Sequence, residues 1–407
     1  MFFVLSKKQK ITKKFVLYRF LSSTIAFGVL HTSLICCVLI QYFKDSGMLP
    51  WQLSIIIVSK RILRIFCDSL FGILFDRFGA KVVFLIGRLL KLLSYIILLY
   101  FTNFYGFVVA MLLDGASYSS IYGKISSYIY NNLSVRKKLK LFPQAMSLYY
   151  LCIDFSVSMM TFFAGLLLKI YGYDTLIYIS IATNLFSICL LIRFVPSANQ
   201  ELKQFKAKTI QDIFLTLKEI IKTKPQFTYL ICLYGTLSFM AWQFISISSL
   251  VLLDMKLSSV ELAMCGSLLK FIMGFGALIS VIIFKQGLSL KCGAKILSFS
   301  MLIGIISAII YNPWFFYIFC ALIAFIYTTI EVSIENNFEY FSDKKIRGTA
   351  ISIAMTFCSF IAIISNLFIG IVAQNINYRI GLIILLALLF LLVFYLTLKI
   401  FKIGKII

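Results

Sequence analysis

The stretch Gly72-Ile-Leu-Phe-Asp76-Arg77-Phe-Gly79-Ala-Lys81 decides how this chain folds. It places three charged residues in a short turn, and long apolar runs flank that turn on both sides. A buried helix of a soluble protein rarely ends in such a turn, whereas a helix that leaves a bilayer meets charge where the hydrocarbon ends. We therefore interpret the stretch as a polar turn between two membrane spans.

The composition supports a membrane protein. Apolar residues make up 61% of the 407 positions and the mean hydropathy is +0.99, whereas ordinary globular chains are about 45–50% apolar. A transmembrane helix needs about 20 mainly apolar residues. Twelve such runs predict twelve transmembrane helices, at residues 18–41, 51–75, 82–102, 104–129, 142–170, 174–195, 226–252, 259–284, 294–311, 314–334, 348–372 and 379–400. Repeated spans exclude a single cleavable signal peptide as their source.

The charge distribution predicts the orientation of these spans. A formal net charge of +24 would fit a nucleic-acid partner, but with the N-terminus inside, the cytoplasmic segments hold 28 Lys and Arg residues and the outer turns hold only four, Lys44, Lys169, Lys256 and Arg379. This bias follows the positive-inside rule and predicts that both termini are cytoplasmic. It also predicts contact with anionic lipid headgroups. Nucleic-acid binding is not expected, because no exposed domain would present the basic residues.

The ten cysteines lie almost all inside predicted spans, and none has C-x-x-C or another metal-ligand spacing. Cys36 and Cys37 are adjacent, which suits neither a metal site nor an easy disulfide. We interpret the cysteines as small apolar residues of the helix interior and expect no metal and no cofactor.

A polar segment divides the twelve runs into two groups of six. The chain is therefore predicted to hold an N-terminal six-helix bundle (1–195), a cytoplasmic linker (196–225) and a C-terminal six-helix bundle (226–407). Apolar residues recur at helical spacing in the linker: Ile210, Ile213, Phe214, Leu217, Ile220 and Ile221. We expect a short amphipathic helix there, on the membrane surface.

A weak internal repeat relates the two groups. Asp76-Arg-Phe-Gly-Ala-Lys81 follows the second run, and Leu290-Lys-Cys-Gly-Ala-Lys295 is predicted to form the turn after the eighth. The second copy keeps a basic residue, Gly, Ala and Lys at the same spacing but lacks the acid. A repeat six spans apart indicates a parallel duplication.

Gly72, Asp76, Arg77, Gly79 and Lys81, between the second and third of twelve spans, resemble the signature motif of the major facilitator superfamily. The resemblance covers the whole chain in topology. It implies two six-helix bundles that move a small solute by alternating access, and a cavity near the bilayer midplane to which spans 1, 4, 7 and 10 contribute most.

Two departures argue against the drug/proton antiporters of that family. Met111 stands where an arginine is usual in span 4, and residues 156–165 of span 5 contain no proline. Both leave the wider family resemblance intact.

The motif residues also have a physical interpretation as a gate latch. Gly72 would let a neighbouring helix approach closely, and Gly79 would permit a positive φ. Asp76 would accept hydrogen bonds from the N-terminal end of a facing helix, while Arg77 and Lys81 would tie the turn to lipid phosphate or to the other bundle. The alternative is a plain turn anchored by its cations.

Ionisable residues inside spans cost about 2.5–3.5 kcal/mol each on insertion scales and are candidates for function. Span 2 holds the densest set, Lys60, Arg61, Arg64 and Asp68. The four-residue spacing from Lys60 through Arg64 and Asp68 to Gly72 and Asp76 places them on one helix face, which we expect to face a cavity or another helix. The other candidates are His31, Arg88, Lys91, Asp114, Asp154 and Lys270.

Deep cations outnumber deep acids by five (Lys60, Arg61, Arg64, Lys91 and Lys270) to three (Asp68, Asp114 and Asp154). In one interpretation each acid pairs with a nearby cation, and the set only locks the bundle together. In the other, one or two cations remain to bind an anionic group of the cargo, as arginine does with carboxylate or phosphate. Asp68, Asp114 and His31 are candidates to carry a proton.

We therefore expect an all-α membrane protein that acts as a secondary active transporter of a small organic solute, coupled to a proton gradient. No P-loop pattern and no nucleophile–base constellation are present, so no enzyme activity is expected. An organic-anion carrier and an efflux pump for amphiphilic compounds both stay open, and a membrane sensor or scaffold is the alternative outside transport. We expect a monomer in a bacterial cytoplasmic membrane.

Overall fold

The computed structural model describes residues 34–121, 141–195, 257–285, 290–310, 312–341 and 347–403, with short pieces at 124–125, 128–129, 133, 249–252 and 254–255. This part of the chain is helical. Its helices are α2 (Leu34–Asp45), α3 (Pro50–Phe78), α4 (Ala80–Tyr100), α5 (Phe104–Ile121), α7 (Phe142–Phe194), α10 (Ser259–Lys285), α11 (Leu290–Ile310), α12 (Pro313–Phe341), α13 (Arg347–Asn375) and α14 (Tyr378–Ile403).

The described helices confirm the all-α prediction. Six of them are long and apolar enough to cross a bilayer by length and composition. His31, the linker 196–225 and most of the predicted span 226–252 lie outside the described residues, so twelve transmembrane helices remain a prediction.

Glycine and proline set the helix ends, as the sequence suggests. Gly79 has φ +80° and separates α3 from α4, which is the positive φ predicted for the turn. Gly172 has φ +77° and interrupts α7 between the predicted spans 142–170 and 174–195. Pro50 and Pro313 begin α3 and α12, where the missing N–H of proline costs no helix hydrogen bond.

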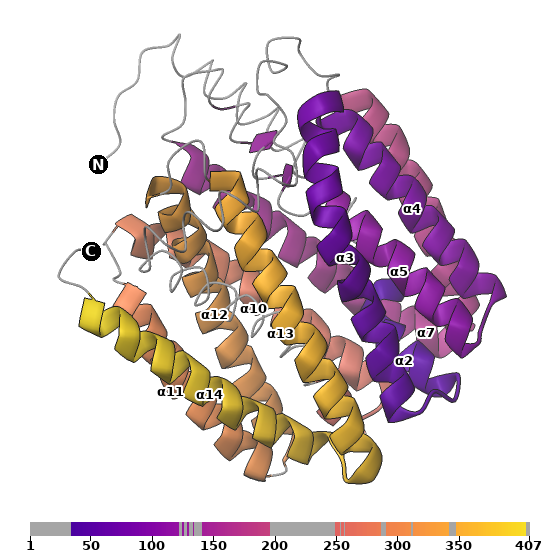
Figure 1. The fold of residues 1–407 in the computed structure, drawn as a ribbon. Helices are drawn as coiled ribbons and strands as arrows, with labels where there is room; N and C mark the ends of the chain where they lie inside the picture. Colours follow the sequence, from indigo (N-terminus) through magenta and orange to yellow (C-terminus); the bar gives the residue numbers. More distant parts are fainter. Residues whose placement is uncertain are drawn as a thin grey trace.

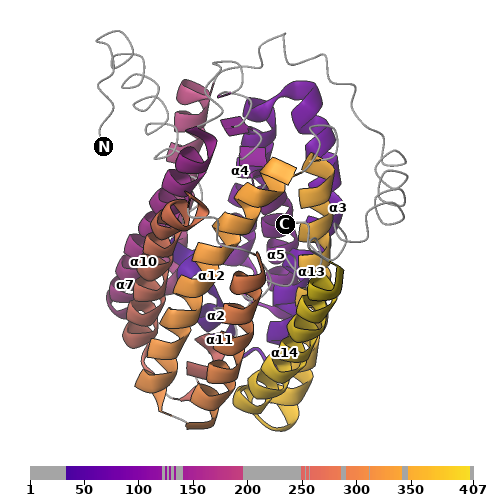
Figure 2. The same ribbon diagram turned by 90° about the vertical axis from the view of Figure 1, so that its left-hand side faces the viewer.

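The helices form two halves that lie side by side (Figure 1). The first half is α2, α3, α4, α5 and α7, and the second half is α10 to α14. Two seams join them, α7 against α10 and α3 against α13, and both pairs run side by side in Figure 2 as well. In the order of the twelve predicted spans, the contacting part of α7 is span 5 and α10 is span 8, and α3 and α13 are spans 2 and 11. Each half therefore contacts the other through its second and fifth spans.

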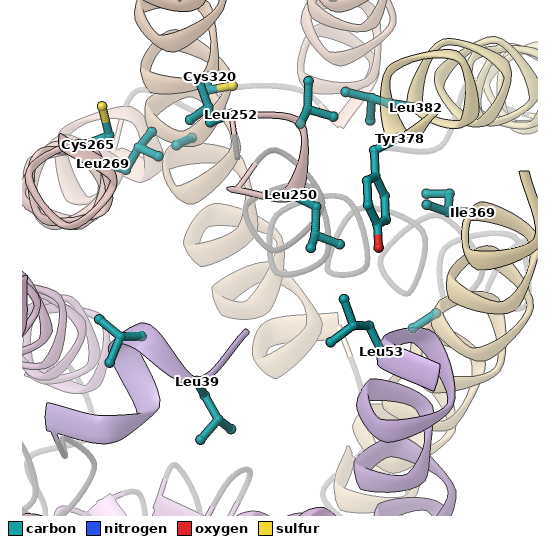
Figure 3. Close-up of a cluster of buried hydrophobic side chains, with 14 of the residues drawn as sticks. Leu39, Leu53, Leu250, Leu252, Cys265, Leu269, Cys320, Ile369, Tyr378 and Leu382 are labelled. Carbon is teal, nitrogen blue, oxygen red and sulfur yellow. The ribbon is translucent and has the colours of Figure 1, made fainter. Parts of the chain in front are cut away.

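The two ends of the molecule differ in how the halves are held. We call them the Gly79 end, where α3 meets α4, and the Gly172 end, where α13 meets α14. Toward the Gly172 end one cluster of buried apolar side chains draws on both halves. Figure 3 shows Leu53 of α3 lying opposite Leu250, Ile369 and Tyr378 of the second half. A second cluster, around Phe84, Ile125 and Met146, belongs to the first half alone.

The surface is apolar where a soluble protein is polar. Phe66, Phe186, Phe299, Ile371 and Leu391 are each more than half exposed, which suits helix faces that meet acyl chains. The interior holds serine, threonine and charged side chains beside its buried apolar clusters. Many of the exposed large side chains are aromatic and lie on these faces.

Gly72 does not mark the close helix approach that the sequence suggested. A Cβ atom on Gly72 would meet nothing within 4 Å, whereas one on Gly115 of α5 would overlap the Lys60 carbonyl oxygen of α3. Helices α3 and α5 therefore touch backbone to backbone at Gly115. The contact depends on which α5 residue faces α3, and the sequence of α3 carries no signal for that.

The prediction that the second copy of the repeat forms a turn was also wrong. Helix α11 begins at Leu290, so the stretch up to Lys295 is its first turns and not a separate turn. In the first copy, by contrast, Gly79 breaks the helix.

We predict that Gly115→Ala lowers the stability of the folded protein by roughly 1–3 kcal/mol, because the added methyl group overpacks the α3–α5 contact. The melting temperature of the detergent-solubilised protein measures this. Gly72→Ala is the matched control, since its methyl group enters open space, and it should leave the melting temperature unchanged. Equal effects of the two substitutions would contradict the Gly115 contact.

Candidate functional site

One face of α3 carries charge into the packing with α5. Arg64 is 4% exposed and Asp68 is 9% exposed. Lys60, one turn before Arg64, keeps 29% of its side chain exposed. Arg64 Nε lies 3.6 Å from Asp68 Oδ2, and the Ser119 hydroxyl of α5 donates to the Arg64 carbonyl oxygen at 3.2 Å. The face thus meets a neighbouring helix, as its four-residue spacing predicted.

Asp114 of α5 lies at the centre of this cluster. Its Oδ2 is 2.6 Å from Lys60 Nζ of α3, and its Oδ1 pairs with Lys91 Nζ of α4. Only 3% of the Asp114 surface is exposed. One carboxylate therefore holds two ammonium groups from two other helices, and it ties α3, α4 and α5 together.

Lys91 connects the cluster to α2. Its Nζ lies 3.2 Å from Cys36 Sγ and 5.1 Å from the centre of the Tyr95 ring. The Cys36 thiol and the Tyr95 hydroxyl are 3.8 Å apart. Burial removes water from this ammonium group, and the carboxylate, the thiol and the aromatic ring offset that cost by their attraction to its charge.

Tyr118 and Lys124 are members of the site that the sequence interpretation missed. The Tyr118 ring lies 4.7 Å from the Arg64 guanidinium and 5.4 Å from Lys60 Nζ, within cation–π range. Lys124 Nζ donates to the Asp68 carbonyl oxygen at 2.9 Å and lies 3.8 Å from its carboxylate. Tyr118 is one turn after Asp114 in α5, and that spacing was the available signal.

Arg88 is buried, but it binds no described carboxylate. Its Nη1 donates to Asn184 Oδ1 of α7 at 3.3 Å, and Asn184 Nδ2 donates back to the Arg88 carbonyl oxygen at 3.0 Å. This reciprocal pair joins α4 to α7. No pattern in the sequence singled out Asn184. Arg61, also on the sequence list of candidates, is half-buried on α3.

Asp154 and Lys270 meet between the two halves. Lys270 Nζ of α10 lies 3.4 Å from Asp154 Oδ1 of α7, and Asp154 is 3% exposed. These two residues are far from each other in sequence, and only the fold brings them together. Of the sequence candidates, then, the structure gathers Lys60, Arg64, Asp68, Lys91 and Asp114 in one cluster and Asp154 with Lys270 in another.

The turn at Gly79 has one described anchor. Lys81 Nζ donates to the Ile192 carbonyl oxygen of α7 at 2.9 Å. This bond lies within the first half, whereas the sequence interpretation expected Lys81 to contact lipid phosphate or the second half. Arg77 is exposed. The Asp76 side chain lies outside what the structure describes, so its predicted partner stays a prediction.

Polar contacts also tie the Gly172 end. The Tyr173 hydroxyl donates to Asp45 Oδ2 at 2.5 Å, and Asp254 Oδ2 accepts from the Tyr378 backbone N–H at 3.2 Å. Burial raises the pKa of the Asp254 carboxyl above its ordinary 3.8, while the Tyr378 N–H and the charge of Lys44 oppose that shift. Lys44 belongs to the first half and Asp254 to the second, so charge attraction acts across this end.

One apolar groove lies away from these charges. It has a volume of 440 Å³ and no charged lining residue; its walls are Leu268, Ile272, Tyr317, Ile318, Ala321, Leu322 and Phe325 of α10 and α12. Several of these residues are on the lipid-facing surface. Within the described residues, no three His, Cys, Asp or Glu side chains group as metal ligands would.

Comparison with known proteins gives a family and a fold. The sequence model of the Major Facilitator Superfamily matches residues 20–334. The structure is similar to the nucleoside transporter NupG, with a TM-score of 0.69 at 16% identity, over 95% of this chain and 99% of that one. It is also similar to a D-xylose–proton symporter, with a TM-score of 0.70 at 14% identity, over 93% and 97% of the chains. No curated protein sequence matches significantly.

We predict that Asp114→Asn destabilises the protein by about 3–5 kcal/mol, because it leaves the buried Lys91 ammonium without its counter-charge. Unfolding of the purified protein in detergent measures the loss. Asp174→Asn, which removes an exposed carboxylate of α7, is the control and should be silent. An unchanged stability of Asp114→Asn would show that the pair contributes little.

A second prediction concerns pH. Because the folded-state pKa of Asp254 is raised above 3.8, its carboxyl group stabilises the fold fully below that value, where it is protonated, and this contribution is lost as pH rises through the folded-state pKa. Asp254→Asn should therefore be more stable than the unmodified protein at neutral pH, and the difference should vanish in acid. Melting temperatures of both proteins across pH measure it; a gap that widens in acid would contradict the sign.

Proposed function

The chain belongs to the major facilitator superfamily, and on that premise we propose that it is a secondary active transporter that moves a small organic anion across the membrane by alternating access, driven by a proton gradient. The observation that carries the anionic part is the cluster at Asp114, where one carboxylate is shared by Lys60 and Lys91.

The charge balance of the first half favours an anionic ligand. Its described buried and half-buried cations include Lys60, Arg64, Arg88, Lys91 and Lys124, whereas its buried carboxylates are Asp68, Asp114 and Asp154. Asp68 and Asp114 each already serve two cations, and Asp154 pairs with Lys270 of the second half. Charge inside a membrane is costly unless compensated, so an excess of this sign attracts an anion from water.

Lys60 is the group best placed to exchange partners. It keeps 29% of its side chain exposed, against 11% for Lys91, while both contact Asp114. A carboxylate or phosphate that reaches Lys60 can replace part of its attraction to Asp114, and the Arg64 guanidinium one turn away offers paired donors. The Tyr118 ring lies beside both cations and supplies an apolar surface for the rest of the ligand.

The two seams suit alternating access. Apolar packing from both halves holds the Gly172 end, and the Gly79 end carries the motif turn. With both termini in the cytoplasm, the Gly172 end faces outward, and the described conformation is closed on that side. Rocking of one half against the other about the seams would open it.

The family and the fold also inform the energy source. One structural neighbour is a proton symporter, and the chain carries no P-loop pattern for ATP. Proton coupling is accordingly part of the proposal. Transport by a monomer is the simplest form, since each chain holds both halves.

We predict that proteoliposomes containing the protein take up or release an organic anion when a pH gradient is imposed. The probes are lactate, succinate and glucose 6-phosphate, with ethidium as an amphiphilic cation. Lys60→Gln and Arg64→Gln should each slow anion transport by roughly 10- to 100-fold, because each removes a charge-assisted hydrogen bond to the anion.

Lys169→Gln is the matched control, since Lys169 is an exposed lysine at the Gly172 end, and it should transport normally. Size-exclusion profiles establish that each variant is folded. Transport of ethidium but of no anion would support an exporter of amphiphilic compounds instead, and no transport of any probe class by folded protein would favour a sensor or scaffold.

A further inference from the structure

The seam between α7 and α10 is the most extensive contact between the two halves, and small residues make it narrow. A Cβ atom on Gly274 of α10 would lie 3.3 Å from Leu151 Cδ1 and 3.6 Å from Asp154 Cβ. A Cβ atom on Gly266 would lie 3.3 Å from Thr161 Cγ2. The helices therefore approach each other too closely here for water to fill a gap between them.

The same seam also carries hydroxyl contacts. The hydroxyls of Ser158 and Ser267 are 3.1 Å apart, and the Ser147 hydroxyl donates to the Ala277 carbonyl oxygen. Hydroxyl contacts of this kind hold helices together in lipid without a large apolar interface. They also re-form easily after a shift, because a serine hydroxyl rotates to suit a new acceptor.

Asp154 and Lys270 lie in the middle of this seam. Among the ion pairs between described side chains, this is the one that joins the two halves, and the other four lie within the first half. Asp154 is 3% exposed, and the Lys270 side chain is 13% exposed. Charge attraction between α7 and α10 therefore depends on the ionisation of one buried carboxyl.

Protonation of Asp154 changes that attraction in a defined direction. The neutral acid no longer balances the charge of Lys270, and the loss of a counter-charge beside a buried ammonium group is unfavourable. The protonated protein therefore favours any arrangement in which Lys270 reaches water or another anion. Because Lys270 belongs to the other half, reaching it requires that α7 and α10 shift relative to each other.

The surroundings leave this control to Lys270. It is the charged group that faces Asp154 from α10. The other ionisable groups described on helices packed against α7 have partners or positions elsewhere: Glu261 and Cys265 on α10, Lys81, Arg88, Lys91, Tyr95 and Tyr100 on α4, and Cys36, Tyr42, Lys44 and Asp45 on α2.

We infer that Asp154 is the binding site of the coupling proton and that Lys270 makes this binding depend on conformation, an assignment that rests on the transport function proposed above. Asp68 and Asp114, the acids favoured from the sequence, each hold two cations within the first half. Their titration would leave the bond between the halves unchanged. Asp154 alone among the described buried acids contributes directly to that bond.

The cycle follows from the difference between two states. When Asp154 and Lys270 are paired, as in this structure, Asp154 binds a proton weakly, and when they are separated it binds one tightly. A ligand shifts a conformational equilibrium toward the state that binds it more tightly, so the proton favours the separated state. The carboxylate takes one proton on the side where the seam opens. It releases that proton when the halves repack and Lys270 returns.

Double electron–electron resonance on full-length protein in proteoliposomes tests this without knowledge of the cargo. Nitroxides at Tyr105→Cys and Ile376→Cys, on a background with the native cysteines replaced by alanine, report the distance between the halves at the Gly172 end. Both positions are exposed, at 78% and 60%. We expect the distance distribution to shift between about pH 8 and 5.

Asp154→Asn should give the low-pH distribution at every pH. Lys270→Gln should move the midpoint of the change to higher pH, because the carboxyl then loses its cation. Glu261→Gln, which removes an exposed acid of α10 that bonds only locally to Ser258 in the described structure, should keep the unmodified response. A wild-type pH response in Asp154→Asn, or an unchanged midpoint in Lys270→Gln, would overturn the assignment.

The outcome is separable from the transport proposal. Lys60→Gln should slow anion uptake by roughly 10- to 100-fold, as predicted above, and leave the pH-dependent distance change intact. If no anion is transported while the change still follows Asp154, the anion-transport proposal fails and the proton site stands. If anions are transported and Asp154→Asn still accumulates them against a pH gradient, the proton site fails and anion transport stands.

Discussion

A carboxylate shared by two lysines holds the first half of this molecule together. Asp114 carries one negative charge in a medium where charge is expensive, and Lys60 and Lys91 reach it from α3 and α4. The three helices cannot separate without exposing unbalanced charge to the hydrocarbon. The backbone contact at Gly115, directly after Asp114, follows from this arrangement, since α3 has to approach closely for Lys60 to reach.

The ion pairs within the first half differ in arrangement from the ion pair between the two halves. Inside the first half, Asp68 and Asp114 each have two cations, so loss of one contact leaves another. Across the α7–α10 seam Asp154 faces Lys270, with serine contacts on either side. A redundant network suits a body that moves as a unit, and a single ion pair suits the seam between two such bodies.

Much of the fold could be read from the sequence because a bilayer restricts the choice. Apolar runs of sufficient length have to be helices there, since no water satisfies an unpaired backbone group. Gly79 and Gly172 mark breaks because only glycine adopts a positive φ without strain. The face of α3 that carries Lys60, Arg64 and Asp68 was predictable for a related reason, because four-residue spacing superimposes side chains on a helix.

The sequence by itself thus determined which segments are helices, where they break and which face of α3 is polar, since these depend on neighbours along the chain. Only the tertiary structure decided that Gly115 and not Gly72 is the close contact, that Arg88 binds Asn184, and that Asp154 meets Lys270. These contacts join residues far apart in the chain. Their partners are set by how helices rotate and shift against one another, and helical periodicity holds no record of that.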